Sequence, residues 1–345
     1  MIRKERLTGL LSYSLIHLVV DMATVFVFFR AGSSVADIDS KVFLGLVYCL
    51  CAFTLQPLVG LIADRFLKAR RTALIGCFGA LISCFIPGVI IPVMIAGISN
   101  AFFHIGGGIY SLEVRRGKAW PIGLFVAPGA IGLLLGGLLG NGVIPYGLPV
   151  AVIALAVSIY FIRNIRDIEE PAPHYMMLSG KIFVAAAVLL MIAIGLRGFV
   201  GMAVSFPWKS IQALLVTSII AVFLGKLLGG FFADKFGQVR VATMALGASA
   251  VLMVAGGRIA FAGLLGLFLF QFAMPIALLA LWSLMPKNPG FAFGLNCLAL
   301  SVGAFPIFFG ASLASPALMI TLVIFAAMAL AVGIRMGERS VIILQ

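Results

Sequence analysis

Two pairs of polar side chains lie inside long apolar runs of this 345-residue chain, and the members of each pair are four positions apart. His17 and Asp21 form the first pair, and Asn100 and His104 form the second. Residues four apart lie on one face of a helix, so the members of each pair can meet a common partner. An imidazole beside a carboxylate can bind and release a proton, and the two groups then titrate as a unit. The first pair is therefore a candidate for proton transfer.

Ionisable groups at the centre of a membrane helix cost about 2.5–3.5 kcal/mol each, so they are functional candidates. We interpret His17 and Asp21 as proton-coupling residues, with a structural hydrogen bond to another helix as the alternative. Asn100 and His104 are candidate substrate ligands, although His104 could also be a packing histidine with its hydrogen bonds satisfied.

Three further polar residues interrupt apolar runs in the second half of the chain, namely Arg197, Lys226 and Gln271. Arg197 could bind an anion, or it could extend to the outer membrane interface. Lys226 has less weight because its long side chain can reach the aqueous surface near Asp234. We expect Asn100, His104, Arg197 and Gln271 to contact substrate.

The composition requires a membrane environment for these residues. Hydrophobic residues make up 63% of the chain and charged residues 10%, against about 45–50% and 25% in soluble domains. Apolar runs of about 20 residues are long enough to span a bilayer as helices. We predict twelve such helices, at 8–29, 42–63, 73–91, 92–112, 121–140, 143–162, 182–203, 210–232, 241–256, 258–281, 291–312 and 316–334.

Two similar cassettes recur about half a chain apart, each after an apolar run. The first reads Gly60-Leu-Ile-Ala-Asp64-Arg65-Phe-Leu-Lys68-Ala-Arg70-Arg71, and the second reads Gly230-Phe-Phe-Ala-Asp234-Lys235-Phe-Gly-Gln-Val-Arg240. A repeat at this spacing indicates duplicated halves. We predict an all-α membrane protein with six-helix bundles at 1–165 and 182–345, joined by a cytoplasmic linker at 166–181.

The distribution of charge predicts the orientation. With both termini in the cytoplasm, 18 of the 24 Lys and Arg residues fall in cytoplasmic segments, and only Arg30, Lys41, Lys209 and Arg258 fall in outer connections. This asymmetry follows the positive-inside rule. It also explains the net charge of +13 without nucleic acid as a partner.

The cassettes, the twelve predicted helices and the central linker together resemble the major facilitator superfamily. Leu67 replaces a glycine that is usual in the first cassette. The resemblance implies a latch that closes the cytoplasmic side, with Asp64 near the start of the eleventh helix and Asp234 near the start of the fifth. A static cap on the loop is the alternative. The latch residues are Gly60, Asp64, Arg65, Lys68, Arg71, Gly230, Asp234, Lys235 and Arg240.

A narrower resemblance links His17-Leu-Val-Val-Asp21 and Asn100-Ala-Phe-Phe-His104 to the fosmidomycin-resistance group of that superfamily. Val20, Ile105 and Gly106 replace the asparagine, proline and glutamate of that group. Pro128-Gly129 and Gly132 partly match the antiporter-associated motif. The resemblance to the fosmidomycin-resistance group implies efflux, and the partial motif match favours antiport.

These features predict a secondary active transporter that works by alternating access. The leading hypothesis is proton-coupled efflux of a small anionic or zwitterionic organic compound. The resemblance to an efflux group favours export, and the excess of embedded basic residues over the embedded acid favours such a substrate. A divalent metal-ion transporter using His17, Asp21 and His104, and a proton-coupled importer, are the alternatives. A non-transporting scaffold is a further class, and no nucleophile–base pair or paired catalytic carboxylates indicate an enzyme. We expect a monomer in the bacterial inner membrane, without a cofactor or resident metal.

Overall fold

The structure, a computed structural model, describes residues 2–168, 174–177, 179–313 and 315–344, and these are mostly helical. The first half contains eight α-helices and two short π-helical segments. They are α1 (Ile2–Ser33), α2 (Ile38–Cys49), η1 (Leu50–Thr54), α3 (Gln56–Ile62), η2 (Ala63–Leu67), α4 (Lys68–Ser83), α5 (Ile90–Glu113), α6 (Trp120–Val126), α7 (Gly129–Gly140) and α8 (Gly147–Asn164).

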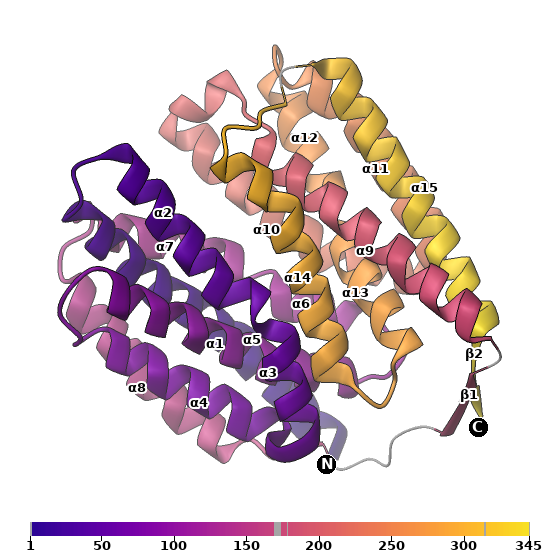
Figure 1. Cartoon of the computed structure of the whole chain (residues 1–345), viewed down its shortest axis with the longest axis horizontal. Coiled ribbons are helices and arrows are strands. Elements are labelled where there is room, and N and C mark those ends of the chain that lie inside the picture. Colours follow the sequence, from indigo (N-terminus) through magenta and orange to yellow (C-terminus); the bar gives the residue numbers. More distant parts are fainter. Residues whose placement is uncertain (1, 169–173, 178, 314, 345) are drawn as a thin grey trace.

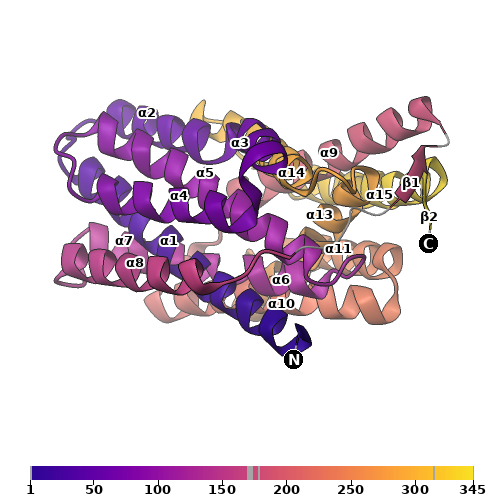
Figure 2. The ribbon, with the colours of Figure 1, turned by 90° about the horizontal axis from the view of Figure 1, so that it is seen from below.

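The second half contains seven α-helices, one short 3₁₀-helix and, with the end of the linker, two short strands. These elements are β1 (His174–Met177), α9 (Gly180–Ala203), η3 (Pro207–Ser210), α10 (Gln212–Phe236), α11 (Gln238–Ala255), α12 (Ala260–Phe270), α13 (Ala273–Leu284), α14 (Pro289–Phe308), α15 (Pro316–Ser340) and β2 (Val341–Leu344). In Figures 1 and 2 the indigo-to-magenta helices lie beside the red-to-yellow ones, and α3, α6, α10 and α14 lie where the two groups meet.

Eleven stretches of the described chain are long and apolar enough to cross a membrane. One of them, Ile38–Ser83, has 46 residues. A straight helix of that length would be about 69 Å long, roughly twice the thickness of a bilayer core. The helix is broken at Lys68, where φ is 60°, so this stretch supplies two passes. Each of the twelve predicted helices therefore has a helical counterpart.

Large apolar side chains cover the outside of the bundle. Leu15 is 65% exposed, Met244 69% and Phe261 75%. Exposed side chains of this size on many helices would be unfavourable in water, and they match the hydrocarbon of a bilayer. The chain is thus an all-α membrane protein with a small strand pair.

Proline explains where three predicted helices differ from the observed ones. The helix predicted at 73–91 ends at Ser83, and Pro87 with Gly88 at φ 96° follows. The helix predicted at 121–140 is divided before Gly129 by Pro128, and the one predicted at 258–281 is divided at Gln271. Proline cannot donate to the carbonyl four residues earlier, and for Pro275 that carbonyl belongs to Gln271.

The first cassette contains a π-helical turn that its counterpart lacks. In the second cassette the helix ends at Gly237, three residues after Asp234, with φ 95°. In the first, η2 adds a residue, so the left-handed backbone falls on Lys68, four residues after Asp64. A π turn accommodates one extra residue within a helix. The cassettes therefore present equivalent carboxylates although Leu67 replaces the usual glycine.

The end of the predicted linker forms a strand, which the all-α prediction did not include. β1 pairs antiparallel with β2, in the register His174 to Leu344 and Met177 to Val341. Residues 169–173 and 178 of the predicted linker lie outside the described residues. The strand pair joins the linker to the carboxyl end of the chain.

Candidate functional site

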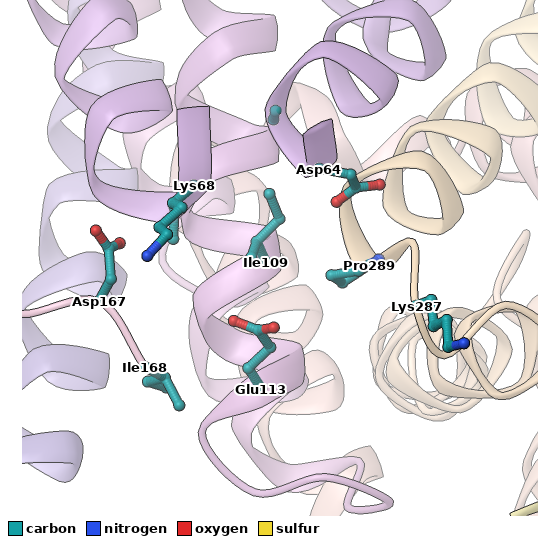
Figure 3. Close-up of a pocket in the computed structure, with 10 residues that line it drawn as sticks. Asp64, Lys68, Ile109, Glu113, Asp167, Ile168, Lys287 and Pro289 are labelled. Carbon is teal, nitrogen blue, oxygen red and sulfur yellow. The ribbon is translucent and has the colours of Figure 1, made fainter. Parts of the chain in front are cut away.

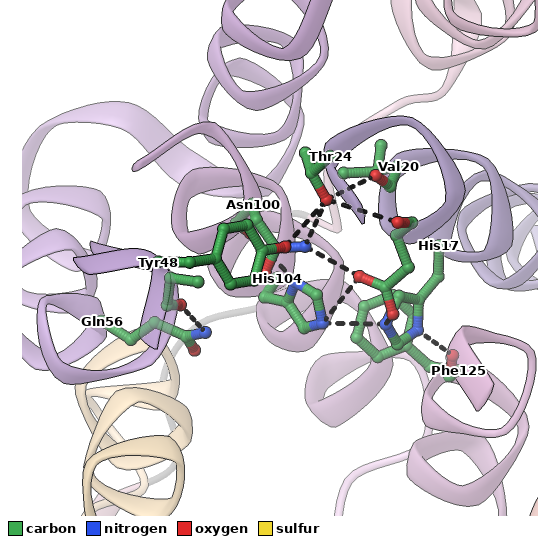
Figure 4. A network of polar contacts seen from close by, with 10 residues as sticks. His17, Val20, Thr24, Tyr48, Gln56, Asn100, His104 and Phe125 are labelled. Carbon is green, nitrogen blue, oxygen red and sulfur yellow. Dashed lines mark hydrogen bonds and ion pairs between the residues drawn. The ribbon is translucent and has the colours of Figure 1, made fainter. Parts of the chain in front are cut away.

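Helices α1 and α5 bring four of the predicted residues into one buried group (Figure 4). His17 and Asp21 come from α1, and Asn100 and His104 come from α5. Their exposed fractions are 3%, 5%, 1% and 8%, respectively. We call these four residues the polar cluster. The four-residue spacing places both members of each pair on one face of their helix, and the two faces meet where α1 packs against α5.

Asp21 is the centre of the polar cluster. Its Oδ1 accepts a hydrogen bond from Asn100 Nδ2 at 2.8 Å, and its Oδ2 is 3.2 Å from His17 Nε2. His104 Nε2 is 3.7 Å from Oδ1. The two histidines also face each other directly, with 2.8 Å between their Nε2 atoms. A single carboxylate thus interacts with two imidazole rings and one side-chain amide.

The remaining ring nitrogens face backbone carbonyls. His17 Nδ1 is 2.7 Å from the Phe125 carbonyl oxygen, and His104 Nδ1 is 2.9 Å from the Asn100 carbonyl oxygen. Carbonyl oxygens only accept hydrogen bonds, so each Nδ1 carries a proton and donates it. These two contacts fix both ring orientations.

Neutral side chains extend the cluster toward α2. Asn100 Nδ2 is 3.3 Å from Thr24 Oγ1, and the Tyr48 hydroxyl donates to the same oxygen at 3.0 Å. Thr24 and Tyr48 were not among the site residues predicted from the sequence. Thr24 follows His17 by seven positions and Asp21 by three, so its place on the same helical face could have indicated it.

Helices α6 and α7 form a tightly packed wall behind the cluster. The His17 ring stacks on Phe125, with 4.7 Å between centroids and 25° between planes. A Cβ atom on Gly129 would lie 2.5 Å from Asp21 Oδ2 and 2.7 Å from His17 Nε2. Only glycine fits there without displacing the charged groups. The partial antiporter motif therefore supplies the space that the polar cluster occupies.

The predicted residues of the second half form a separate group. Arg197 is 5% exposed, and its Nη2 donates to the Phe270 carbonyl oxygen at 3.3 Å. The guanidinium also lies over the Phe270 ring, 5.1 Å from its centroid. Arg197 Nε has no hydrogen-bond partner among the described residues. This buried cation thus retains a donor for another group.

Gln271 follows the residue whose carbonyl Arg197 contacts, and Lys226 interacts electrostatically with Arg197. Gln271 follows Phe270 directly and packs on α10, because a Cβ on Gly225 would lie 2.9 Å from the Gln271 Cβ. Lys226 interacts electrostatically with Arg197, Asp21 and His104. Lys226 had little weight as a candidate from the sequence, yet in the structure it interacts electrostatically with members of both groups.

The first cassette contacts the start of α14. Asp64 Oδ1 accepts a hydrogen bond from the Gly290 amide at 2.8 Å, and Oδ2 accepts one from the Phe291 amide at 2.9 Å. A carboxylate at this place satisfies free N–H groups and interacts favourably with the helix dipole. A Cβ on Gly60 would collide with the backbone of Gly290. Gly60 therefore permits the approach that brings Asp64 to the helix.

The second cassette makes the equivalent contact with the start of α6. Asp234 Oδ1 accepts from the Ala119 amide at 3.0 Å, and Oδ2 accepts from the Trp120 amide at 2.9 Å. A Cβ on Gly230 would lie 2.5 Å from the Ala119 carbonyl oxygen. We call the end of the bundle that carries both contacts the cassette end.

The basic residues of the cassettes lie on the surface. Arg65 and Lys235 are exposed and lie over the rings of Phe66 and Phe236, at 5.4 Å and 5.2 Å from the centroids. Arg71 and Arg240 are also exposed. In both cassettes, then, the basic side chains are exposed, whereas the carboxylate binds helix amides of the other half of the chain.

A cavity of about 570 Å³ opens beside the first cassette at the cassette end. Figure 3 shows the charged side chains on its walls, which are Asp64, Lys68, Glu113, Asp167 and Lys287. Asp167, from the predicted linker, accepts a hydrogen bond from the Arg70 amide at 2.8 Å. Asp167 was not among the residues predicted from the sequence. This contact fixes the start of the linker to the first turn of α4.

Comparison with known proteins identifies the fold. No protein-family model matches the chain, and no curated protein does. The solved structure of the E. coli fucose:proton symporter FucP, in a single-residue variant, matches with a TM-score of 0.65 and 11% identity. That match covers 96% of this chain and 98% of the symporter.

A second match is the human organic anion transporter MFSD10 (TETRAN), with a TM-score of 0.70 and 12% identity. It covers 97% of this chain and 99% of the human protein. Both are major facilitator transporters. The fold of this chain is therefore the major facilitator fold over nearly its whole length.

Proposed function

We propose that this chain is a proton-coupled secondary transporter that exports a small anionic or zwitterionic organic compound by alternating access. The fold supports transport, because matching proteins described as a fucose:proton symporter and an organic anion transporter share it over nearly the whole chain. The apolar outer surface and the eleven long apolar stretches support a place in a membrane. We propose that this membrane is the bacterial inner membrane.

The observation that carries the coupling proposal is the polar cluster. The side chains of Asp21, His17 and His104 are buried, and each approaches the other two through nitrogen or oxygen atoms at 3.7 Å or less. Ionisable groups inside a membrane are costly and therefore indicate a functional site. Lys226 interacts electrostatically with Asp21 of the cluster and with Arg197. A carboxylate or another anion would satisfy the free Nε donor of Arg197. Asn100, His104 and Gln271 complete the proposed substrate contacts.

We further propose that residues 1–165 and 182–345 act as two halves, with 166–181 as the cytoplasmic linker and both termini in the cytoplasm. The Asp64 and Asp234 contacts, together with the basic residues of the cassettes, would then hold the cytoplasmic side closed. Opening would break the hydrogen bonds between the two carboxylates and four helix amides, in which each half caps a helix of the other. The carrier would work as a monomer by antiport.

The test begins with a substrate, because transport must be measured with a real compound. Thermal melting of purified protein in the presence of organic anions and zwitterions identifies ligands by the stabilisation they confer. A ligand is then loaded into proteoliposomes, and its exit is measured with and without an inward proton gradient. We expect the gradient to accelerate exit. An equal rate of ligand exit with and without the gradient would count against proton coupling. Accumulation of the ligand inside the vesicles, driven by the inward gradient, would support the proton-coupled importer.

Two variants assign the roles within this assay. Asp21→Asn keeps the shape and removes the charge, so we expect it to abolish the response to the gradient. Arg197→Gln removes the buried cation, so we expect weaker stabilisation by anionic ligands. Asp39→Asn and Arg258→Gln are matched controls, because both residues are exposed. Equal effects of the buried and exposed variants would refute the assignment.

A divalent metal ion is a second candidate cargo. Ligand atoms of His17, Asp21 and His104 all lie within 4.8 Å of one another, and imidazole with carboxylate suits several divalent ions. Both Nε2 atoms would have to give up their mutual contact to bind an ion. Titration of purified protein with Co²⁺, followed by absorption spectroscopy, tests this alternative. Bound Co²⁺ that is lost in His17→Ala would support it, and an unchanged spectrum would exclude it.

A further inference from the structure

The contact between His17 and His104 poses a question of hydrogen-bond polarity. Each Nδ1 donates to a carbonyl oxygen, at 2.7 Å and 2.9 Å. A neutral imidazole has one donor and one acceptor, so a ring that donates through Nδ1 has a bare lone pair on Nε2. If both rings were neutral, two lone pairs would face each other across 2.8 Å. That arrangement is repulsive, and it lies in a buried place where no solvent screens it.

One additional proton removes the conflict. With that proton, one ring becomes an imidazolium whose Nε2–H donates to the bare Nε2 of the other. The 2.8 Å separation is normal for a nitrogen–nitrogen hydrogen bond of this charge-assisted kind. Two additional protons would place two imidazolium N–H groups against each other at the same distance. The geometry therefore fits one extra proton and neither zero nor two.

The charges around the pair agree with that number. From α1, Asp21 lies 3.2 Å and 3.7 Å from the two Nε2 atoms and supplies one negative charge. From α10, Lys226 opposes positive charge on His104. The other neighbours are neutral, namely Asn100 on α5, Tyr48 on α2 and the Phe125 ring on α6. One imidazolium with one carboxylate leaves the cluster without net charge.

We propose that His17 and His104 share a single excess proton between their Nε2 atoms, with Asp21 as its counter-charge. This inference rests on the proposed function and gives the carrier a load of one proton in this conformation. Loss of the proton would leave two lone pairs and a carboxylate pointing into one space. The two Nε2 atoms and the carboxylate then accept hydrogen bonds and donate none, so they would take the ammonium group of a zwitterionic substrate. Proton and ammonium group would then exclude each other, which is the requirement for exchange.

Nitrogen NMR can detect the proton directly. The chain has three histidines, and His174→Gln leaves only the two of interest. Protein labelled with ¹⁵N-histidine and placed in lipid nanodiscs reports the protonation of each ring nitrogen from its chemical shift. At about pH 7 we expect both Nδ1 atoms to be protonated. We also expect a coupling between the two Nε2 nitrogens across the hydrogen bond, because one proton joins them.

Two variants check the origin of that signal. His104→Gln removes one partner, so the coupling must disappear while His17 keeps its proton beside Asp21. Asp21→Asn removes the counter-charge, so the coupling must disappear at about pH 7 because the excess proton leaves. Asp39→Asn, which changes an exposed acid, must leave the spectrum unchanged. Retention of the coupling in Asp21→Asn would overturn the role of Asp21.

Three results in the parent protein would overturn the shared proton. They are a bare Nδ1 in either ring, two fully protonated rings, and two neutral rings without Nε2 coupling. Each can be separated from a failure of the proposed function, because proton-driven exit is measured in proteoliposomes. Gradient-driven exit without the coupling would refute the shared proton alone. Coupling without any gradient response would refute proton-driven transport and leave the shared proton in place.

Discussion

Gly60 of α3 and Gly290 of α14 touch through their backbones, so a side chain on Gly60 would collide with the carbonyl of Gly290. The contact lies directly beside Asp64, whose Oδ1 accepts a hydrogen bond from the Gly290 amide at 2.8 Å. Close packing and helix capping therefore depend on each other at this point. The second cassette repeats the relationship, because a Cβ on Gly230 would lie 2.5 Å from the Ala119 carbonyl oxygen.

Gly60→Ala should weaken the closed state of the cassette end. The added methyl group meets backbone atoms that cannot rotate away, and such overpacking costs about 1–3 kcal/mol. We expect the Gly290 and Phe291 amides to exchange hydrogen faster, as measured by mass spectrometry. Gly247→Ala is the control, because a Cβ there meets no atom within 4 Å. Equal protection in both variants would show that Gly60 does not govern this contact.

Asp64→Asn should open the same contact for a different reason. An Asn side chain has no charge, and its NH2 group would replace one of the two carboxylate oxygens and place a donor against a helix amide. Hydrogen bonds to charged groups contribute about 1.5–3 kcal/mol each. We expect roughly tenfold or greater loss of exchange protection at these amides.

If the two cassettes hold one gate, the Asp64→Asn variant must also lose protection at Ala119 and Trp120, which Asp234 caps. The reciprocal Asp234→Asn variant must likewise expose Gly290 and Phe291. Protection lost only next to the substituted carboxylate would mean that the contacts are independent static caps.

The parts of this site that follow from local spacing could be predicted from the sequence. His17 and Asp21 share a face because 3.6 residues make one helical turn, and the paired cassettes follow from a direct repeat. The breaks at Pro128 and Pro275 could also have been predicted, since proline lacks the N–H that continues a helix.

Contacts between helices depend on rotations and depths that the sequence alone does not define. The 2.8 Å approach of His17 to His104 depends on how α1 and α5 rotate against each other. The electrostatic interaction of Lys226 with Asp21 and Arg197 depends on the depth of α10 in the bundle. Asp167 caps Arg70 from a segment 97 residues away, and no local pattern marks such a partner.

Lys68→Gly should stabilise the protein. Lys68 has φ 60° and ψ 173°, a region populated almost only by glycine that costs other residues about 1–3 kcal/mol. Glycine relieves this strain, although it adds freedom to the unfolded chain. We expect a higher melting temperature in detergent for Lys68→Gly than for Lys68→Ala, which removes the same side chain and keeps the strain. A lower melting temperature for the glycine variant would contradict the strained conformation.

Gly129→Ala should disrupt the polar cluster without changing any ionisable group. The new methyl group would lie 2.5 Å from Asp21 Oδ2 and 2.7 Å from His17 Nε2, so the carboxylate and the imidazole must separate. We expect loss of the Nε2 coupling in the NMR spectrum and at least tenfold slower gradient-driven exit. Gly137→Ala on the same helix is the matched control, because its Cβ would make an ordinary 3.5 Å contact with Phe29. If both alanine variants retain the coupling and the exit rate, the packing of α7 against Asp21 does not organise the cluster.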